Sequence, residues 1–96
     1  MKVAEVIEKC NSESIWSFWE FEEEFPDLKR AASNLNVDRL RWFEISTNVY
    51  ECEDCFVGVE GVSEVFSEMM SYSDCDCPCT AVEYESFTTI SYRPKS

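Results

Sequence analysis

Apolar and polar side chains alternate along the middle of the chain, over residues 42–62. A period of two residues is typical of β-strands that bury one face. A short acidic segment divides this stretch, so the pattern predicts two strands joined by a turn. Because the other face is polar, we expect a single layer of helices to cover the apolar face of this hairpin. The residues assigned to the apolar face are Phe43, Ile45, Val49, Val57 and Val59.

The segment before the hairpin has the apolar spacing of helices, in which positions i, i+3, i+4 and i+7 share one face. This spacing predicts a short helix over residues 2–10. A second helix follows Ser12 or Ser14 and ends at Pro26, with aromatic residues on one side and glutamates on the other. A third helix is predicted to begin at Asp27. Its apolar positions are Leu28, Ala31, Ala32 and Leu35.

The segment after the hairpin predicts one more helix and one strand. Ser63 is a suitable N-cap for a helix over about residues 64–72. A cysteine-containing loop with Pro78 follows, since its turn-forming residues disfavour regular structure. Residues 80–93 then alternate again and are rich in Thr, Tyr and Phe, which favours a long strand. Phe87 is out of phase with the other apolar residues of this segment, so we expect a bulge or bend near residues 86–88.

Together these elements describe a single α+β domain over residues 1–96. They follow the order α-α-α-β-β-α-β, with a three-stranded antiparallel sheet packed on the N-terminal helices. The chain is long enough for one hydrophobic core and too short for a second domain. Hydrophobic residues make up 45% of it and aromatic residues 15%, which is typical of a folded protein rather than of a disordered acidic tail.

The chain is strongly acidic. Its formal charge is −12, from 20 Asp and Glu residues against 8 Lys and Arg residues. Such a field repels nucleic acid and anionic membranes and attracts basic protein surfaces, although a solvated surface without a partner is the alternative. The first residues lack a signal-peptide pattern, and no apolar span of about 20 residues is present. We therefore expect a cytoplasmic protein that binds neither nucleic acid directly nor membranes.

The residue types of common catalytic sites are missing. The chain has no histidine, which removes the usual general base and the usual partner of a catalytic serine or cysteine. Its two glycines, Gly58 and Gly61, are too few for a phosphate-binding loop. We therefore expect no enzymatic activity.

Two groups of cysteines are the sharpest chemical feature. Cys52 and Cys55 lie two residues apart in the hairpin turn, and Cys75 and Cys77 lie in the loop before the last strand. Two thiolates from each segment can form a tetrahedral zinc site. The spacing of the second pair departs from the usual two intervening residues, and reduced thiols or a disulfide formed in air are the alternatives. Apart from this zinc ion, the sequence indicates no cofactor.

Candidate partner-binding residues come from two segments, an aromatic and acidic one and the acidic hairpin turn. Large aromatic side chains anchor interfaces, although covering the sheet is the alternative role for them. Neighbouring aromatic residues of a helix cannot all face one way, so at least one is expected to stay exposed. The carboxylates could mimic the spaced charges of a nucleic-acid backbone or form an ordinary solvated surface. The candidates are Trp16, Trp19, Glu20, Glu22, Glu23, Glu24, Glu51, Glu53 and Asp54.

In its short length, strong acidity, lack of enzyme motifs and helical N-terminal half, the chain resembles the small anti-defence proteins of phages and mobile elements, anti-CRISPR proteins in particular. The resemblance is one of general character, since those proteins share no common motif, and it assigns no residue a role. It implies inhibition by stoichiometric binding to the basic groove of a nuclease or nucleoprotein complex, such as a CRISPR effector. The second hypothesis is a small zinc-stabilised structural or adaptor module.

Overall fold

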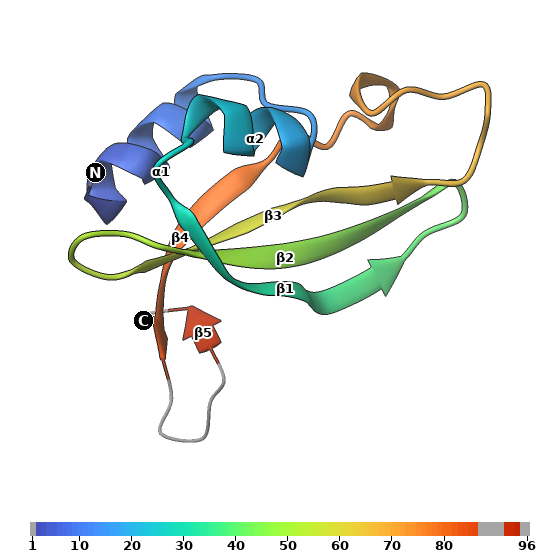
Figure 1. The fold of residues 1–96 in the computed structure, drawn as a ribbon. Helices are drawn as coiled ribbons and strands as arrows, with labels where there is room; N and C mark the ends of the chain where they lie inside the picture. The colour runs from blue at the N-terminus through green and yellow to red at the C-terminus, as the bar shows by residue number, and fades with distance from the viewer. Residues whose placement is uncertain (1, 87–91, 95–96) are drawn as a thin grey trace.

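The computed structural model describes residues 2–86 and 92–94. Two helices come first, and a five-stranded antiparallel sheet follows. The elements are α1 (Val3–Ser12), α2 (Phe18–Glu24), β1 (Lys29–Arg39), β2 (Phe43–Glu51), β3 (Phe56–Val65), the 3-10 helix η1 (Ser73–Cys75), β4 (Thr80–Ser86) and β5 (Tyr92–Pro94). Both helices lie on the same face of the sheet (Figure 1). No helix within the described residues is long and apolar enough to cross a bilayer.

The strands are neighbours in the order in which they occur in the chain, and each neighbouring pair is antiparallel. The connections therefore alternate between the two ends of the sheet (Figure 1). The β1–β2 connection (residues 40–42) and the β3–β4 connection (residues 66–79) share one end, which we call the loop end. The β2–β3 turn (residues 52–55) lies at the opposite end, which we call the turn end.

A core of apolar side chains joins the two helices to the sheet. Phe21 of α2 is fully buried, and its ring centroid lies 4.7 Å from that of Phe25 and 4.8 Å from that of Tyr50 on β2. Each buried large apolar side chain contributes about 1.5–3 kcal/mol to stability, so this cluster fixes the helices on the sheet. Its buried members are Val3, Val6, Cys10, Ile15, Phe21, Phe25, Tyr50, Val57, Val59, Cys79 and Ala81.

The predicted hairpin is present as β2 and β3, but its faces differ from the prediction. The four-residue turn pairs Tyr50 with Val57 and Val49 with Gly58. Paired residues share a face, and successive residues alternate, so Val49 lies on the face opposite the one that carries Val57. The helices cover the face of Tyr50 and Val57. Placing Val49 and Val57 together under the helices was therefore wrong, because the alternation within each strand does not specify how the turn aligns the two strands.

Tyr84 of β4 lies over Gly58 on the face that the helices leave uncovered. A Cβ atom built on Gly58 would lie 2.1 Å from Cε1 of the Tyr84 ring. Both residues are buried, so glycine at this position is what lets the aromatic ring approach the backbone of β3.

The third predicted helix is strand β1 in the structure, so this prediction was wrong. Repeated bulges make β1 advance three residues for every two residues of β2. Residues three positions apart in β1 therefore occupy equivalent places beside β2, which explains the helix-like apolar spacing. Asn34 and Asn36 lie within the bulged segments and have positive φ angles of 56° and 49°, which asparagine tolerates better than most residues. The pairs that define the bulges are Ala32–Val49, Leu35–Thr47 and Asp38–Ile45.

The helix predicted over residues 64–72 is also absent, and the sheet has five strands rather than three. Strand β3 continues to Val65, and the backbone N–H of Phe66 donates to the carbonyl of Trp42 at 2.8 Å. The residues that would begin the predicted helix therefore pair with β2 or its preceding loop instead. The predicted final strand is divided into β4 and β5, which pair with each other; of the predicted bend near residues 86–88, residues 87 and 88 lie outside the described part of the chain.

Candidate functional site: an aromatic groove at the loop end

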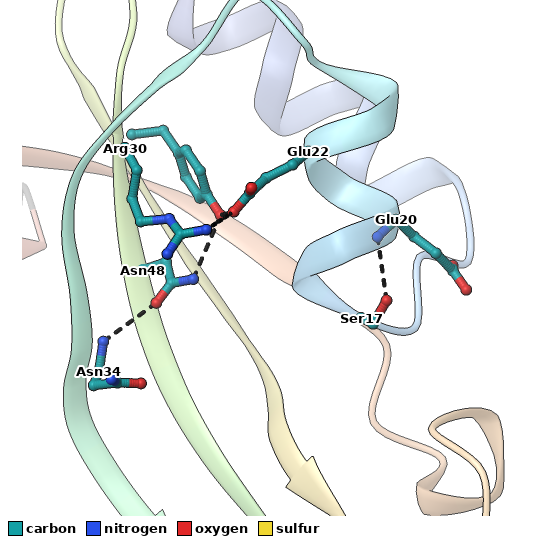
Figure 2. A network of polar contacts seen from close by, with 7 residues as sticks. Ser17, Glu20, Glu22, Arg30, Asn34 and Asn48 are labelled. Atoms are coloured by element: carbon teal, nitrogen blue, oxygen red, sulfur yellow. Dashed lines mark hydrogen bonds and ion pairs between the residues drawn. The ribbon is translucent and has the colours of Figure 1, made fainter.

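The start of α2 is held by a reciprocal pair of hydrogen bonds. The hydroxyl of Ser17 accepts the backbone N–H of Glu20 at 3.2 Å, and Oε2 of Glu20 accepts the backbone N–H of Trp16 at 3.1 Å. Figure 2 shows the Ser17–Glu20 bond at the first turn of the helix. This arrangement resembles a capping box and satisfies backbone donors that a helix start leaves free. It holds the backbone of the first turn of α2 in place.

Phe18 and Trp19 point in different directions from this first turn. Phe18 is half-buried and packs against the core, and its ring lies near Gly61 of β3. Trp19 is 69% exposed. The expectation that at least one aromatic residue of this helix remains exposed is therefore confirmed. Tryptophan is enriched among the residues that anchor interfaces, so the exposed Trp19 is a candidate contact for a partner.

A groove of about 490 Å³ lies between the start of α2, the end of β3 and the β3–β4 connection. This volume is within the range of about 300–1,000 Å³ that ligand pockets occupy. Aromatic side chains supply much of its surface, and Glu20 is the charged residue among the described residues that line it. The lining residues are Ser17, Phe18, Trp19, Glu20, Val62, Ser63 and Tyr72.

Tyr72, which the sequence did not single out, comes from the long β3–β4 connection. One hydrogen bond within this connection and one to the segment before α2 hold it in place. The carboxylate of Asp74 accepts the backbone N–H of Ser71 at 2.8 Å, and this bond, with a contribution from the Ser71 hydroxyl, lowers the pKa of Asp74. Near its end, the backbone N–H of Cys79 donates to the carbonyl of Ile15 at 2.6 Å. The groove is therefore bounded by segments with defined positions.

Exposed apolar residues gather at the loop end, both in the groove and beyond it. Besides the first turn of α2, they occur on the last part of β1, in the β1–β2 connection and in the β3–β4 connection, which the strand order brings to the same end of the sheet (Figure 1). Two arginines stack on aromatic rings there, Arg39 on Phe66 at 4.6 Å and Arg41 on Trp42 at 4.9 Å. The exposed apolar residues at this end are Trp19, Val37, Leu40, Trp42, Met69 and Tyr72.

The carboxylate of Glu22 takes part in a network of polar contacts within the fold. Its Oε2 accepts a hydrogen bond from the Tyr50 hydroxyl at 2.8 Å and pairs with Arg30 of β1. Figure 2 shows the carboxylate next to Arg30, and the hydrogen bonds continue from the Tyr50 hydroxyl to Asn48 and from Asn48 to the backbone N–H of Asn34. Burial raises the pKa of the Tyr50 hydroxyl, and the negative charge of Glu22 raises it further, so the hydroxyl remains protonated and can donate.

The other candidates within residues 16–24 also differ in their partners and in their exposure. Glu24 pairs with Lys9 of α1 at 3.0 Å, which raises the pKa of Lys9. Glu23 is exposed, and Trp16 is half-buried. Glu22 and Glu24 thus tie α2 to the rest of the fold, whereas Glu23 and Trp19 face outward. Reversing the charge of the whole glutamate run would therefore break contacts within the fold as well as change the surface.

The acidic hairpin turn lies at the turn end, away from the groove (Figure 1). Oδ1 of Asp54 accepts the backbone N–H of Val3 at the start of α1 at 2.9 Å, and this bond lowers the pKa of Asp54. Glu51 and Glu53 are exposed and line a second cleft of about 390 Å³. The structure therefore separates the nine candidates into two surfaces, and their role in binding stays a prediction.

The four predicted zinc ligands are not brought together. Cys52 and Cys55 lie at the turn end, and Cys75 and Cys77 lie in the β3–β4 connection at the loop end (Figure 1). All six cysteines are free thiols. Within residues 2–86 and 92–94, no group of three or more Cys, Asp or Glu side chains is arranged to hold a metal ion. Burial also raises the pKa of Cys52 to about 11.

The groove offers aromatic and apolar contact area and one carboxylate, an arrangement that can bind another molecule. No protein-family model, curated protein or solved structure matches the chain. Its function must therefore be inferred from the site itself.

Proposed function

We propose that this chain is a non-enzymatic inhibitor that binds the basic surface of a nucleic-acid-handling protein, such as a nuclease or a CRISPR effector, in the cytoplasm. The observation that carries the proposal is the exposed Trp19 beside an aromatic groove, on a chain with a formal charge of −12. The groove supplies a place for partner side chains, and the acidic field supplies attraction to a basic surface.

The two features have different tasks in binding. Charge of one sign accelerates encounter with an oppositely charged partner and fixes orientation more than it raises affinity. Affinity is concentrated in a few residues, and tryptophan and tyrosine are enriched among them. Trp19 and Tyr72 fit this second role because they are exposed and large, and Trp19 lies in the capped first turn of α2.

Inhibition follows if the bound chain occupies a surface that nucleic acid also needs. A protein with this net charge competes electrostatically with a phosphate backbone for lysines and arginines. The resemblance to anti-CRISPR proteins agrees with this mode of action, although it concerns general character and no shared residue.

The test starts with capture of partners by the immobilised chain and continues with the purified partner. We expect a basic nucleic-acid-binding protein whose nuclease or nucleic-acid-binding activity falls with one equivalent of the chain. The Trp19→Ala variant is expected to lose at least tenfold in inhibitory potency. The matched control is Trp42→Ala, which removes a tryptophan that is 49% exposed at the same end but does not line the groove. Equal potency of Trp19→Ala and the unaltered chain would contradict the proposal, as would captured proteins that do not bind nucleic acid.

A further inference from the structure

We propose that the aromatic groove at the loop end receives an arginine side chain of the partner, held between the aromatic lining and the carboxylate of Glu20. This inference rests on the proposed function, because it specifies which chemical group of a basic partner enters the groove. It goes further than net charge, since a charged surface alone would accept lysine equally well.

The lining of the groove favours a flat cation. Phe18, Trp19 and Tyr72 provide three aromatic rings in one groove, and a guanidinium group stacks on such rings through cation–π attraction. The same protein already uses this contact twice at its loop end, where Arg39 and Arg41 lie over aromatic rings at 4.6 and 4.9 Å. Aromatic rings in this acidic environment are therefore suitable partners for arginine.

Glu20 supplies the matching negative charge. Its side chain is already positioned, because Oε2 accepts the backbone N–H of Trp16 at 3.1 Å. A carboxylate has about four acceptor sites, and this bond occupies one of them. Arginine can approach the others with its fork of N–H donors. Because Glu20 is held before binding, little conformational entropy is lost when the partner arrives.

Arginine fits these features better than lysine or an aliphatic residue. Its guanidinium is planar, weakly hydrated and able to stack and donate at the same time, whereas an ammonium group is strongly hydrated and compact. An aliphatic residue would fill the groove but would leave Glu20 without a counter-charge. No lysine or arginine is among the described residues that line the groove, so an incoming cation meets no like charge on its walls.

The test uses the full chain and four synthetic peptides of identical length, in which the central residues are arginine, lysine, citrulline or norleucine. Citrulline keeps the shape of arginine and removes its charge. Calorimetry at about 0.15 M salt is expected to show the arginine peptide binding about fivefold or more tighter than the lysine peptide, which corresponds to about 1 kcal/mol of cation–π and fork-geometry preference.

Three variants locate the effect. Trp19→Ala is expected to weaken the arginine peptide about tenfold. Glu20→Gln keeps an acceptor for the Trp16 N–H and is expected to reduce the preference for arginine over citrulline at least fivefold. Trp42→Ala, the matched control, is expected to stay within twofold of the unaltered chain. Circular dichroism of each variant establishes that it is folded before binding is compared.

Two results would overturn the arginine assignment. Equal affinity for the arginine and lysine peptides, unchanged by Glu20→Gln, would show general charge attraction only. Tightest binding of the norleucine peptide would show an apolar anchor instead. If either occurs while Trp19→Ala still abolishes inhibition of the purified partner, the proposed function stands and the arginine assignment alone fails. If Trp19→Ala changes neither peptide binding nor inhibition, both fail.

Discussion

The hydroxyl of Tyr50 links the sheet to α2, so its removal tests the network that positions the groove. It donates to Glu22 at 2.8 Å and receives a longer hydrogen bond from Nδ2 of Asn48 at 3.4 Å. Tyr50→Phe deletes both bonds and leaves the ring packing with Phe21 in place. The variant therefore isolates the polar contribution.

The expected cost can be worked from these contacts. A hydrogen bond to a charged group contributes about 1.5–3 kcal/mol, but the side chain of Glu22 is 38% exposed and keeps its pairing with Arg30, so water can replace part of the loss. Asn48 is buried and loses an acceptor, which adds part of a further 1–3 kcal/mol, reduced because the bond is long. We expect a total loss of about 2 kcal/mol in the free energy of unfolding.

Urea unfolding followed by far-UV circular dichroism measures this loss. For a urea dependence of about 2 kcal/mol per molar, the midpoint should fall by about 1 M. The matched control is Tyr84→Phe, because Tyr84 is also buried but its hydroxyl makes no hydrogen bond among the described residues. It should lose less than about 0.5 kcal/mol. A Tyr50→Phe variant no less stable than Tyr84→Phe would refute the reasoning.

A double-mutant cycle assigns the loss to the correct pair. Combining Tyr50→Phe with Glu22→Ala should show a coupling of roughly 1 kcal/mol, because each change alone removes the one hydrogen bond that the two residues share. Additive effects would mean that the hydroxyl stabilises the fold through Asn48 instead.

Three further changes test other parts of the structure. Gly58→Ala should destabilise the fold by about 1–3 kcal/mol, measured by urea unfolding, since the added methyl group would overlap the Tyr84 ring; an unchanged midpoint would contradict the close approach. Asp54 has a lowered pKa in the folded chain, so its contribution is present above the unfolded pKa of about 3.9 and is lost as pH falls through the folded value. Asp54→Asn should therefore reduce the loss of stability between about pH 5 and 3, and an unaltered pH profile would argue against its bond to α1. Burial raises the pKa of Cys10 to about 11 and that of Cys79 to about 12, so both should resist iodoacetamide at pH 7 until urea is added; rapid labelling of the native chain, read by mass spectrometry, would show that these thiols are accessible.

The sequence predicted those elements whose local pattern agrees with their environment. The central hairpin and the first helix carry clear periods, and Pro26 lies two residues after the end of α2. The predicted cap of α2 at Ser12 or Ser14 was wrong, because α1 extends to Ser12 and the hydroxyl of Ser17 caps α2. The prediction from sequence failed where hydrogen-bonded pairing between strands determines the structure. The three-residue spacing of Ala32 and Leu35 fits a helix equally well, and bulged pairing with β2 is what makes this segment a strand.

The candidate site was predicted in part for the same reason. Trp19 could be anticipated because a helix cannot bury every aromatic residue of the segment. Tyr72 could not, because its segment was predicted to be helical and long-range contacts alone bring it to the start of α2. Likewise, a run of glutamates does not reveal that Glu22 and Glu24 have internal partners. The kind of partner that we propose follows from charge composition, and packing indicates which candidate residues are exposed to meet it.

The most direct test of the binding account is the affinity for the purified partner across a salt series, for the unaltered chain and for Trp19→Ala. The account predicts that affinity falls with salt for both chains, with the same slope, because the acidic field is unchanged. It also predicts that Trp19→Ala binds about tenfold more weakly at every salt concentration, because the anchor is missing. Affinity that does not depend on salt, or two salt series that coincide, would contradict it.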